Sequence, residues 1–230
     1  MLEISDLRVG YGRTTVVHGV DVKVGTGEIV AVMGHNGAGK TTLLRAAVGL
    51  LPVETGTIRL GGEDVTRAKP HRRVRLGLAY VPQGQQSFGQ LTTRENLQLV
   101  ADTFGAAGTA RMNEALDLFP ALKSLLTRRA GLLSGGQRQQ LAIARALIVG
   151  PKIMLLDEPT EGIQPSVVGE IEDAIVQLAG SGMSVLLVEQ HIGFALDACA
   201  RYYVLESGRV STQGAGGAAN ESDVRSAMAL

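Results

Sequence analysis

The sequence contains only one cysteine and carries no excess of either charge. A single cysteine, Cys199, cannot form a disulfide within the chain, which favours a reducing compartment. We expect Cys199 to fill space in the core on an apolar helix face rather than to act in catalysis. Lysine plus arginine and aspartate plus glutamate number 22 each, so the formal net charge is zero. Without a net basic charge, we expect no nucleic-acid partner.

Long hydrophobic runs are also missing. The apolar stretches IVAVM, LLRAAVGLL and SVLLV are all too short to span a bilayer as a helix. The first ten residues, MLEISDLRVG, include acidic residues, so we expect no secretory signal there. A function at a membrane would need a membrane-spanning part from another chain. The length of 230 residues and the 45% hydrophobic content predict one globular domain over residues 1–230.

Short β-rich runs alternate with helical patterns through much of the sequence. Residues 20–24 alternate valine with charged residues, which is typical of a half-buried antiparallel strand. Residues 28–33 form a short apolar run, typical of a strand covered on both faces. Three further runs of this kind lie at residues 78–81, 153–156 and 184–188. A helix predicted to open at Pro165 separates the last two runs, so we predict an α/β fold with a mostly parallel sheet and an antiparallel β edge.

Two segments depart from this alternation. Residues 84–150 contain helical patterns and no strand pattern, so we predict a helical subdomain inserted between strands. Phe88 and Leu91 within it are candidates for an exposed apolar docking patch, with core packing as the alternative. Residues 212–220, TQGAGGAAN, predict a flexible turn before a short last helix.

Residues 34–41 read GHNGAGKT, which is the pattern G-x-x-x-x-G-K-[ST] between a predicted strand and a predicted helix. Small residues let the backbone wrap closely around phosphate oxygens, with N–H groups pointing inward at a helix N-terminus. Lys40 would place its charge on the β- and γ-phosphates, and Thr41 would bind Mg²⁺. The pattern predicts a nucleotide site but leaves kinase, GTPase, helicase and transporter ATPase open. The expected nucleotide contacts are Gly34, Asn36, Gly37, Ala38, Gly39, Lys40, Thr41 and Thr42.

An acid pair ends the apolar run IMLLDE at residues 153–158. The carboxyl end of a buried strand is where α/β sheets place ligands. Asp157 would hold Mg²⁺, and Glu158 would polarise the attacking water. The alternative is an acid pair that simply ends a strand in solvent.

Residues 133–137 read LSGGQ and precede a long helical pattern. Taken alone, Ser134 and Gln137 predict a capping box at a helix start. Their place between the phosphate-binding loop and the acid-terminated strand adds a second interpretation. With these motifs together, the sequence resembles the ABC (ATP-binding cassette) ATPase family, whose members bind and hydrolyse ATP with Mg²⁺.

The resemblance implies roles for particular residues. Tyr11, in VGYG, would stack on adenine, with a buried strand tyrosine as the alternative. Gln83, in YVPQG, would join the Mg²⁺ and water site to a membrane partner. His191, in VEQH, would be the switch histidine that contacts the γ-phosphate. The implied catalytic residues are thus Glu158, His191, Lys40 and Gln83. The implied contacts to ATP held by a second subunit are Ser134, Gly135, Gly136 and Gln137.

One position departs from the family pattern. Many members carry an aspartate four residues after the Pro-Thr pair, and Gln164 stands there in this sequence. This variant resembles the branch that serves uptake of branched-chain amino acids, amides and urea. It implies an importer at the cytoplasmic face of the membrane, with a second ATP-binding subunit, permease subunits and, indirectly, an extracytoplasmic solute-binding protein. The alternatives are a non-transport ABC ATPase, a P-loop kinase or GTPase, and a regulatory binder without catalysis.

Overall fold

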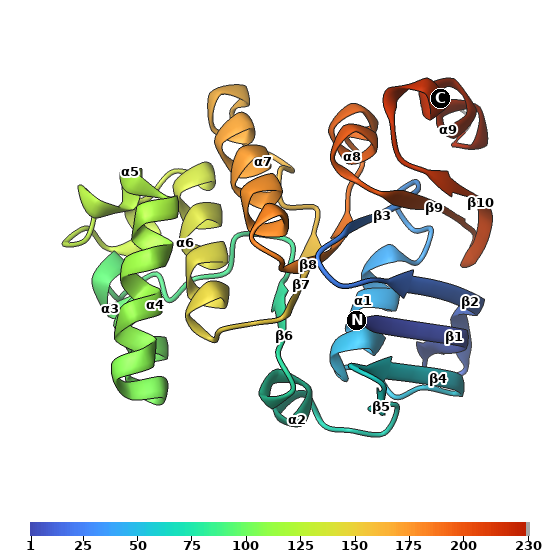
Figure 1. Cartoon of the computed structure of the whole chain (residues 1–230), viewed down its shortest axis with the longest axis horizontal. Coiled ribbons are helices and arrows are strands. Elements are labelled where there is room, and N and C mark those ends of the chain that lie inside the picture. The colour runs from blue at the N-terminus through green and yellow to red at the C-terminus, as the bar shows by residue number, and fades with distance from the viewer. Residues whose placement is uncertain (229–230) are drawn as a thin grey trace.

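The computed structural model describes residues 1–228, which fold into two sheets and surrounding helices (Figure 1). The strands are β1 (Leu2–Tyr11), β2 (Thr14–Val24), β3 (Ile29–Met33), β4 (Thr55–Leu60), β5 (Glu63–Asp64), β6 (Leu78–Val81), β7 (Ile153–Asp157), β8 (Ser184–Val188), β9 (Arg201–Glu206) and β10 (Arg209–Ala215). The helices are α1 (Lys40–Val48), α2 (Pro70–Arg75), α3 (Thr93–Ala101), α4 (Gly105–Leu118), α5 (Pro120–Lys123), α6 (Gly135–Ile148), α7 (Pro165–Gly180), α8 (Ile192–Ala198) and α9 (Glu221–Ala227). None of the helices within residues 1–228 combines the length and the apolar character needed to cross a membrane.

The larger sheet has the strand order β10-β9-β3-β8-β7-β6. Five of these strands are parallel, and β10 pairs antiparallel with β9 at one edge. The smaller sheet, β2-β1-β4-β5, is antiparallel throughout. The predicted α/β fold with a mostly parallel sheet and an antiparallel part is therefore confirmed.

The parallel strands are buried on both faces because two cores sandwich them. Val30 and Val32 of β3 face a core built with α1 and the antiparallel sheet. Ala31 and Met33, one residue out of phase, face a second core that includes α6, α7 and α8. Side chains alternate between the faces of a strand, so a strand between two cores is apolar at every position.

The strand predicted at residues 20–24 is confirmed as the end of β2. Val20, Val22 and Val24 are buried, while Asp21 and Lys23 are exposed. The antiparallel sheet therefore buries one face against α1 and leaves the other face to solvent.

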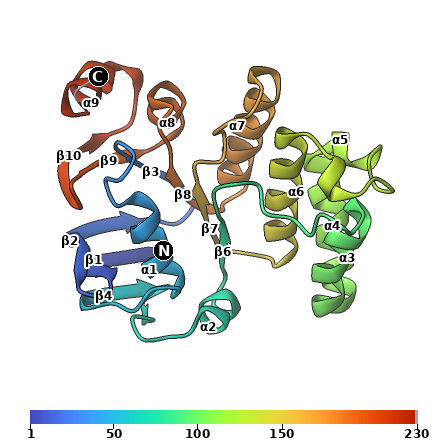
Figure 2. The ribbon, with the colours of Figure 1, turned by 180° about the vertical axis from the view of Figure 1, so that it is seen from behind.

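The segment predicted as helical, residues 84–150, contains α3 to α6 and two short 3₁₀ turns. Its one isolated β-bridge joins Thr92 and Arg129. These helices lie at the end of the molecule opposite the antiparallel sheet in both views (Figures 1 and 2). The division into a separate subdomain stays a prediction.

The turn predicted at residues 212–220 is wrong in its first half. Residues up to Ala215 belong to β10, whose backbone pairs with β9. Glycine at position 214 of this strand makes room for Tyr202, because a Cβ added to Gly214 would lie 3.0 Å from the ring of Tyr202. A tertiary contact therefore placed a Gly/Ala-rich segment in a strand. The short last helix is present as α9.

Cys199 is buried, as expected, but it follows the last residue of α8 instead of lying on a helix face. Burial raises the pKa of its thiol to about 11, so the thiolate that reacts or binds metals is disfavoured.

The C-terminal end of α1 is held by Arg73 of α2, which is 1% exposed. Its guanidinium donates to the carbonyl oxygens of Ala46 and Ala47 at 2.7 Å, and to those of Thr66 and Ala68 at 3.1 Å. A cation at the end of a helix satisfies free carbonyls and opposes the negative end of the helix dipole. Arg73 thereby anchors the helix whose other end begins at the phosphate-binding loop.

Candidate active site

Residues that follow four neighbouring strands of the parallel sheet form the site, and three of these strands lead to predicted site residues. The phosphate-binding loop, residues 34–39, follows β3, and Asp157 and Glu158 come at the end of β7. Gln190 follows β8, which lies between these two strands, and Gln83 follows β6. Since parallel strands all end at the same edge of a sheet, these residues meet there, as ligand sites in α/β folds do.

The loop of residues 34–39 depends on glycine at two positions. A Cβ on Gly34, whose φ is +150°, would lie 2.2 Å from the carbonyl oxygen of Leu205. Gly39 precedes α1 with a φ of 104°, a left-handed conformation that glycine adopts without a Cβ penalty. Lys40 then begins α1 and is 4% exposed. Its ammonium donates to the carbonyl oxygens of Gly34 at 2.7 Å and His35 at 3.0 Å.

The carboxylate of Glu158 lies at the centre of the site and contacts three side chains, through one ion pair and two hydrogen bonds. Lys40 Nζ lies 3.1 Å from Oε1. Gln190 Nε2 donates to the same oxygen at 2.9 Å, and Gln83 Nε2 donates to Oε2 at 3.1 Å. The backbone of Glu158 has a φ of +48°, an uncommon conformation for a residue with a side chain and one that is held by its surroundings. Glu158 is therefore a buried, fixed carboxylate rather than an acid that ends a strand in solvent.

Asp157 lies deeper in the site and is 1% exposed. Its two oxygens accept hydrogen bonds from Thr41 Oγ1 at 3.2 Å and from the hydroxyl of Tyr80 at 3.1 Å. Burial raises the pKa of Asp157, and the two hydroxyl donors oppose this shift. A hydroxyl and a carboxylate oxygen on adjacent walls are hard donors of the kind that Mg²⁺ binds, so the residues fit this ion.

A cavity of about 290 Å³ opens beside this cluster. It is lined by Tyr11, Val16, Asn36, Gly37, Gly39, Lys40, Thr41, Thr42, Gln83 and Glu158. Tyr11 is 44% exposed at its mouth, and its hydroxyl accepts a hydrogen bond from Arg45 at 3.3 Å. Its ring is thus available to a flat ligand, and the alternative of a buried strand tyrosine does not hold. We call this cavity the cradle.

The residues of the LSGGQ motif lie elsewhere. Ser134 caps α6 by accepting a hydrogen bond from the backbone N–H of Gln137 at 3.2 Å, and Gln137 Oε1 accepts one from the backbone N–H of Ser134 at 3.0 Å. The predicted capping box is therefore present. A Cβ on Gly136 would lie 2.5 Å from the side chain of Val167, so α6 starts in close contact with α7. None of these residues lines the cradle of its own chain.

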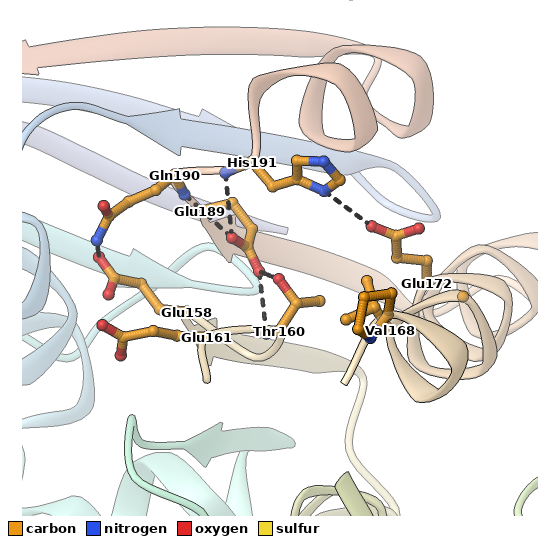
Figure 3. A pocket seen from close by; sticks show the side chains of 10 residues that line it. Glu158, Thr160, Glu161, Val168, Glu172, Glu189, Gln190 and His191 are labelled. Carbon is orange, nitrogen blue, oxygen red and sulfur yellow. Dashed lines mark hydrogen bonds and ion pairs between the residues drawn. The ribbon is translucent and has the colours of Figure 1, made fainter. Parts of the chain in front are cut away.

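His191 is not brought to the cradle. Its Nδ1 lies 3.2 Å from Oε1 of Glu172 on α7, and Figure 3 shows its ring pointing away from Glu158. Gln190, the preceding residue, points to Glu158 instead (Figure 3). The sequence offered one signal that could have found it, a polar side chain shortly after a buried strand.

The sequence analysis missed two further residues: Tyr80, whose hydroxyl donates to Asp157, and Glu189. Glu189 is 2% exposed, and one of its oxygens accepts hydrogen bonds from the backbone N–H and the hydroxyl of Thr160 at 3.2 and 2.8 Å. The other oxygen accepts from the backbone N–H groups of Gln190 at 3.0 Å and His191 at 3.4 Å. Burial raises the pKa of this carboxyl. Glu189 therefore ties the loop after β8 to the loop after β7.

Comparison with known proteins places these features in a family. The family model described as "ABC transporter" matches residues 17–161. The chain is 40% identical to the probable branched-chain amino acid transport ATP-binding protein LivF of Archaeoglobus fulgidus, covering 93% of this chain and 92% of the relative. It is 41% identical to the high-affinity branched-chain amino acid transport ATP-binding protein BraG of Pseudomonas aeruginosa, covering 95% and 94%.

A relative with a different named role is also similar. The lipopolysaccharide export system ATP-binding protein LptB of Acidithiobacillus ferridurans is 38% identical, covering 93% of this chain and 90% of the relative. Among solved structures, a nucleotide-free ATP-binding cassette from an ABC transporter superposes with a TM-score of 0.88 at 26% identity, covering 98% and 95%. The phosphate-binding loop, the acid pair and these likenesses agree, and the chain belongs to the ABC transporter family as an ATP-binding subunit that hydrolyses ATP.

Proposed function

We propose that this chain powers an importer, coupling ATP hydrolysis to the uptake of branched-chain amino acids, urea or short amides through separate permease subunits. The observation that carries the proposal is its likeness to LivF and BraG, at 40% and 41% identity over more than nine tenths of this chain. LptB, at 38% identity, gives the second candidate, an ATPase for lipopolysaccharide export.

The chemistry proposed for the site follows from its contacts. Lys40 binds the β- and γ-phosphates, and the ring of Tyr11 stacks on adenine. Thr41 and Asp157, with Gln83 beside them, hold Mg²⁺, which when bound neutralises charge on the phosphate oxygens. Glu158 accepts the proton of the attacking water. The buried pairing of Lys40 with Glu158 supports these roles, because it places a cation and a base at one point of the cradle.

A second ATP-binding subunit, a copy of this chain or a sister chain, would complete the site. Ser134 caps α6, and Gly135, Gly136 and Gln137 form its first turn, where the positive end of a helix suits a phosphate. They do not line the cradle of their own chain, so their contact with ATP would be made across a subunit interface. A ligand held by donors from two chains closes the pair when it binds and releases it when hydrolysis removes the γ-phosphate.

The helical segment would carry this motion to the permease at the cytoplasmic face of the membrane. Phe88 is 47% exposed there, with the guanidinium carbon of Arg145 4.7 Å from its ring centre. Leu91 is half-buried beside it. This exposed aromatic supports a docking patch. An extracytoplasmic solute-binding protein would act on the permease and contact this chain only indirectly.

The test is transport by the complete complex. The chain would be purified with its membrane partners, reconstituted into proteoliposomes and assayed for ATP-dependent uptake of leucine, urea and acetamide. Glu158→Gln supplies a control with an unhydrolysed nucleotide. Uptake of one of these solutes that fails in the control supports the proposal. ATP hydrolysis that lipopolysaccharide stimulates, with none of the three solutes taken up, would overturn it in favour of export.

A further inference from the structure

The order of strands places Gln190 between the two halves of the active site. β8 lies between β3, which carries the phosphate-binding loop, and β7, which carries Glu158. A residue that follows β8 therefore lies between the phosphate-binding loop and Glu158. Gln190 Nε2 donates to Asn36 Oδ1 of the loop at 2.8 Å and to Glu158 Oε1 at 2.9 Å. One side-chain amide thus joins the phosphate-binding loop to the proposed catalytic carboxylate.

We propose that Gln190 is the positioning residue for Glu158 and holds this carboxylate in place when Lys40 turns to the phosphates of ATP. The inference rests on the role proposed for Glu158. In the structure, Lys40 pairs with Glu158 Oε1. In the G-x-x-x-x-G-K-[ST] pattern, the lysine ammonium binds the β- and γ-phosphates, so the same group of Lys40 is expected to bind ATP. Binding of ATP would therefore draw away the charged partner of Glu158, a residue that is only 7% exposed.

Side-chain amides are suited to hold Glu158 in place after Lys40 has turned to the phosphates. Gln190 and Gln83 donate one hydrogen bond to each carboxylate oxygen, so the orientation of Glu158 survives without Lys40. A neutral amide does not itself titrate, so its hydrogen bond orients the carboxylate of Glu158 without placing a second charge beside it. A protonated imidazole in the same place would stabilise the charged form and weaken the base.

Glu189 fixes the position of the Gln190 backbone relative to the loop that carries Glu158. Its carboxylate accepts the backbone N–H of Gln190 and also bonds Thr160, two residues after Glu158 (Figure 3). The loops after β8 and β7 are therefore fixed relative to each other through a buried group. The side chain of His191 leaves on the opposite side toward Glu172 (Figure 3). Of these two neighbours, Gln190 donates a side-chain hydrogen bond to Glu158, whereas the ring of His191 pairs with Glu172.

The first test compares Gln190→Ala with Gln177→Ala, an exposed glutamine on α7, and with His191→Ala. Gln190→Ala should lower kcat for ATP hydrolysis about 10- to 100-fold, because a displaced base acts less well. Its affinity for ATP in calorimetry should stay close to that of the wild type, since Lys40 is intact. The other two substitutions should reduce kcat far less. A Gln190→Ala enzyme as fast as the wild type, or a greater loss in His191→Ala, would overturn the inference.

The second test reads the protonation of the site, which a purely structural role would not change. Gln190→His should add an acid limb to the kcat–pH profile near the ordinary histidine pKa of about 6.5. Below that pH the imidazolium would weaken Glu158 as a base, so the rate should fall. An unchanged profile in an active Gln190→His enzyme would count against the proposal. Glu158→Gln separates the two hypotheses, because if that enzyme hydrolyses ATP normally the role of Glu158 itself fails, and with it this inference.

Discussion

The ammonium of Lys40 and the carboxylate of Glu158 form a buried ion pair in which Nζ and Oε1 are 3.1 Å apart. The side chains are 4% and 5% exposed. Each group serves as the other's counter-charge in the nucleotide-free structure. We expect the binding of ATP to exchange this ion pair for one between Lys40 and the phosphates, which avoids leaving an unpaired buried cation.

Removing the charge of Glu158 should separate binding from hydrolysis. In Glu158→Gln the proposed base is lost, so we expect kcat for phosphate release to fall by about 10²- to 10⁴-fold. Binding of ATP should be retained or become tighter, because Lys40 no longer has to leave an anionic partner. Phosphate release and calorimetry measure the two quantities. Normal turnover in this variant would show that another group activates the water.

Breaking the ion pair from the other side should reduce the stability of the nucleotide-free protein. Lys40→Met leaves the carboxylate of Glu158 without its cation, at a cost of about 3–5 kcal/mol in the free energy of unfolding. The double variant Lys40→Met, Glu158→Gln removes both charges and should recover most of that loss. Urea denaturation of the wild type, of the single variants Lys40→Met and Glu158→Gln, and of the double variant measures the coupling. A double variant no more stable than Lys40→Met would contradict the stabilising pair.

The buried carboxyl of Asp157 should make stability depend on pH in a known direction. Its pKa in the folded protein is raised by burial, so the folded state holds a proton more tightly than the unfolded state does. Its favourable contribution is full below the unfolded pKa of about 4 and is lost as pH rises through the raised value. An asparagine at position 157 does not titrate, so the Asp157→Asn protein does not lose stability in this way. Its free energy of unfolding relative to that of the wild type should therefore increase between pH 4 and pH 8. Urea denaturation across this range would show a constant difference if the pKa were not raised.

Gln164 offers a test of the unusual loop after Glu158. Gln164 is the N-cap residue of α7, precedes Pro165 and makes no side-chain capping hydrogen bond. Aspartate is a strong N-cap residue, and its charge is favourable at the positive end of a helix. Gln164→Asp should therefore raise the free energy of unfolding by about 0.5–1 kcal/mol. Gln164→Asn, which can cap without a charge, is the matched control, and no gain in either variant would mean that the loop geometry prevents capping.

The sequence by itself determined the local parts of this protein. The pattern of residues 34–41 indicated a phosphate-binding loop, and the short apolar runs within residues 28–33 and 153–156 predicted strands buried on both faces. Pro165 marked the start of α7. Such features depend on residues that are neighbours in the chain, so their spacing is visible without the fold.

Only the tertiary structure decided which of these parts meet. The order β3-β8-β7 results from crossovers between distant segments, and it brings Gln190 to Glu158 while His191 turns to Glu172. Pairing with β9 likewise makes a strand of residues 212–215, where the sequence predicted the start of a flexible turn. In each case the deciding contacts join residues far apart in sequence, and their free energy exceeds the local preference of the chain.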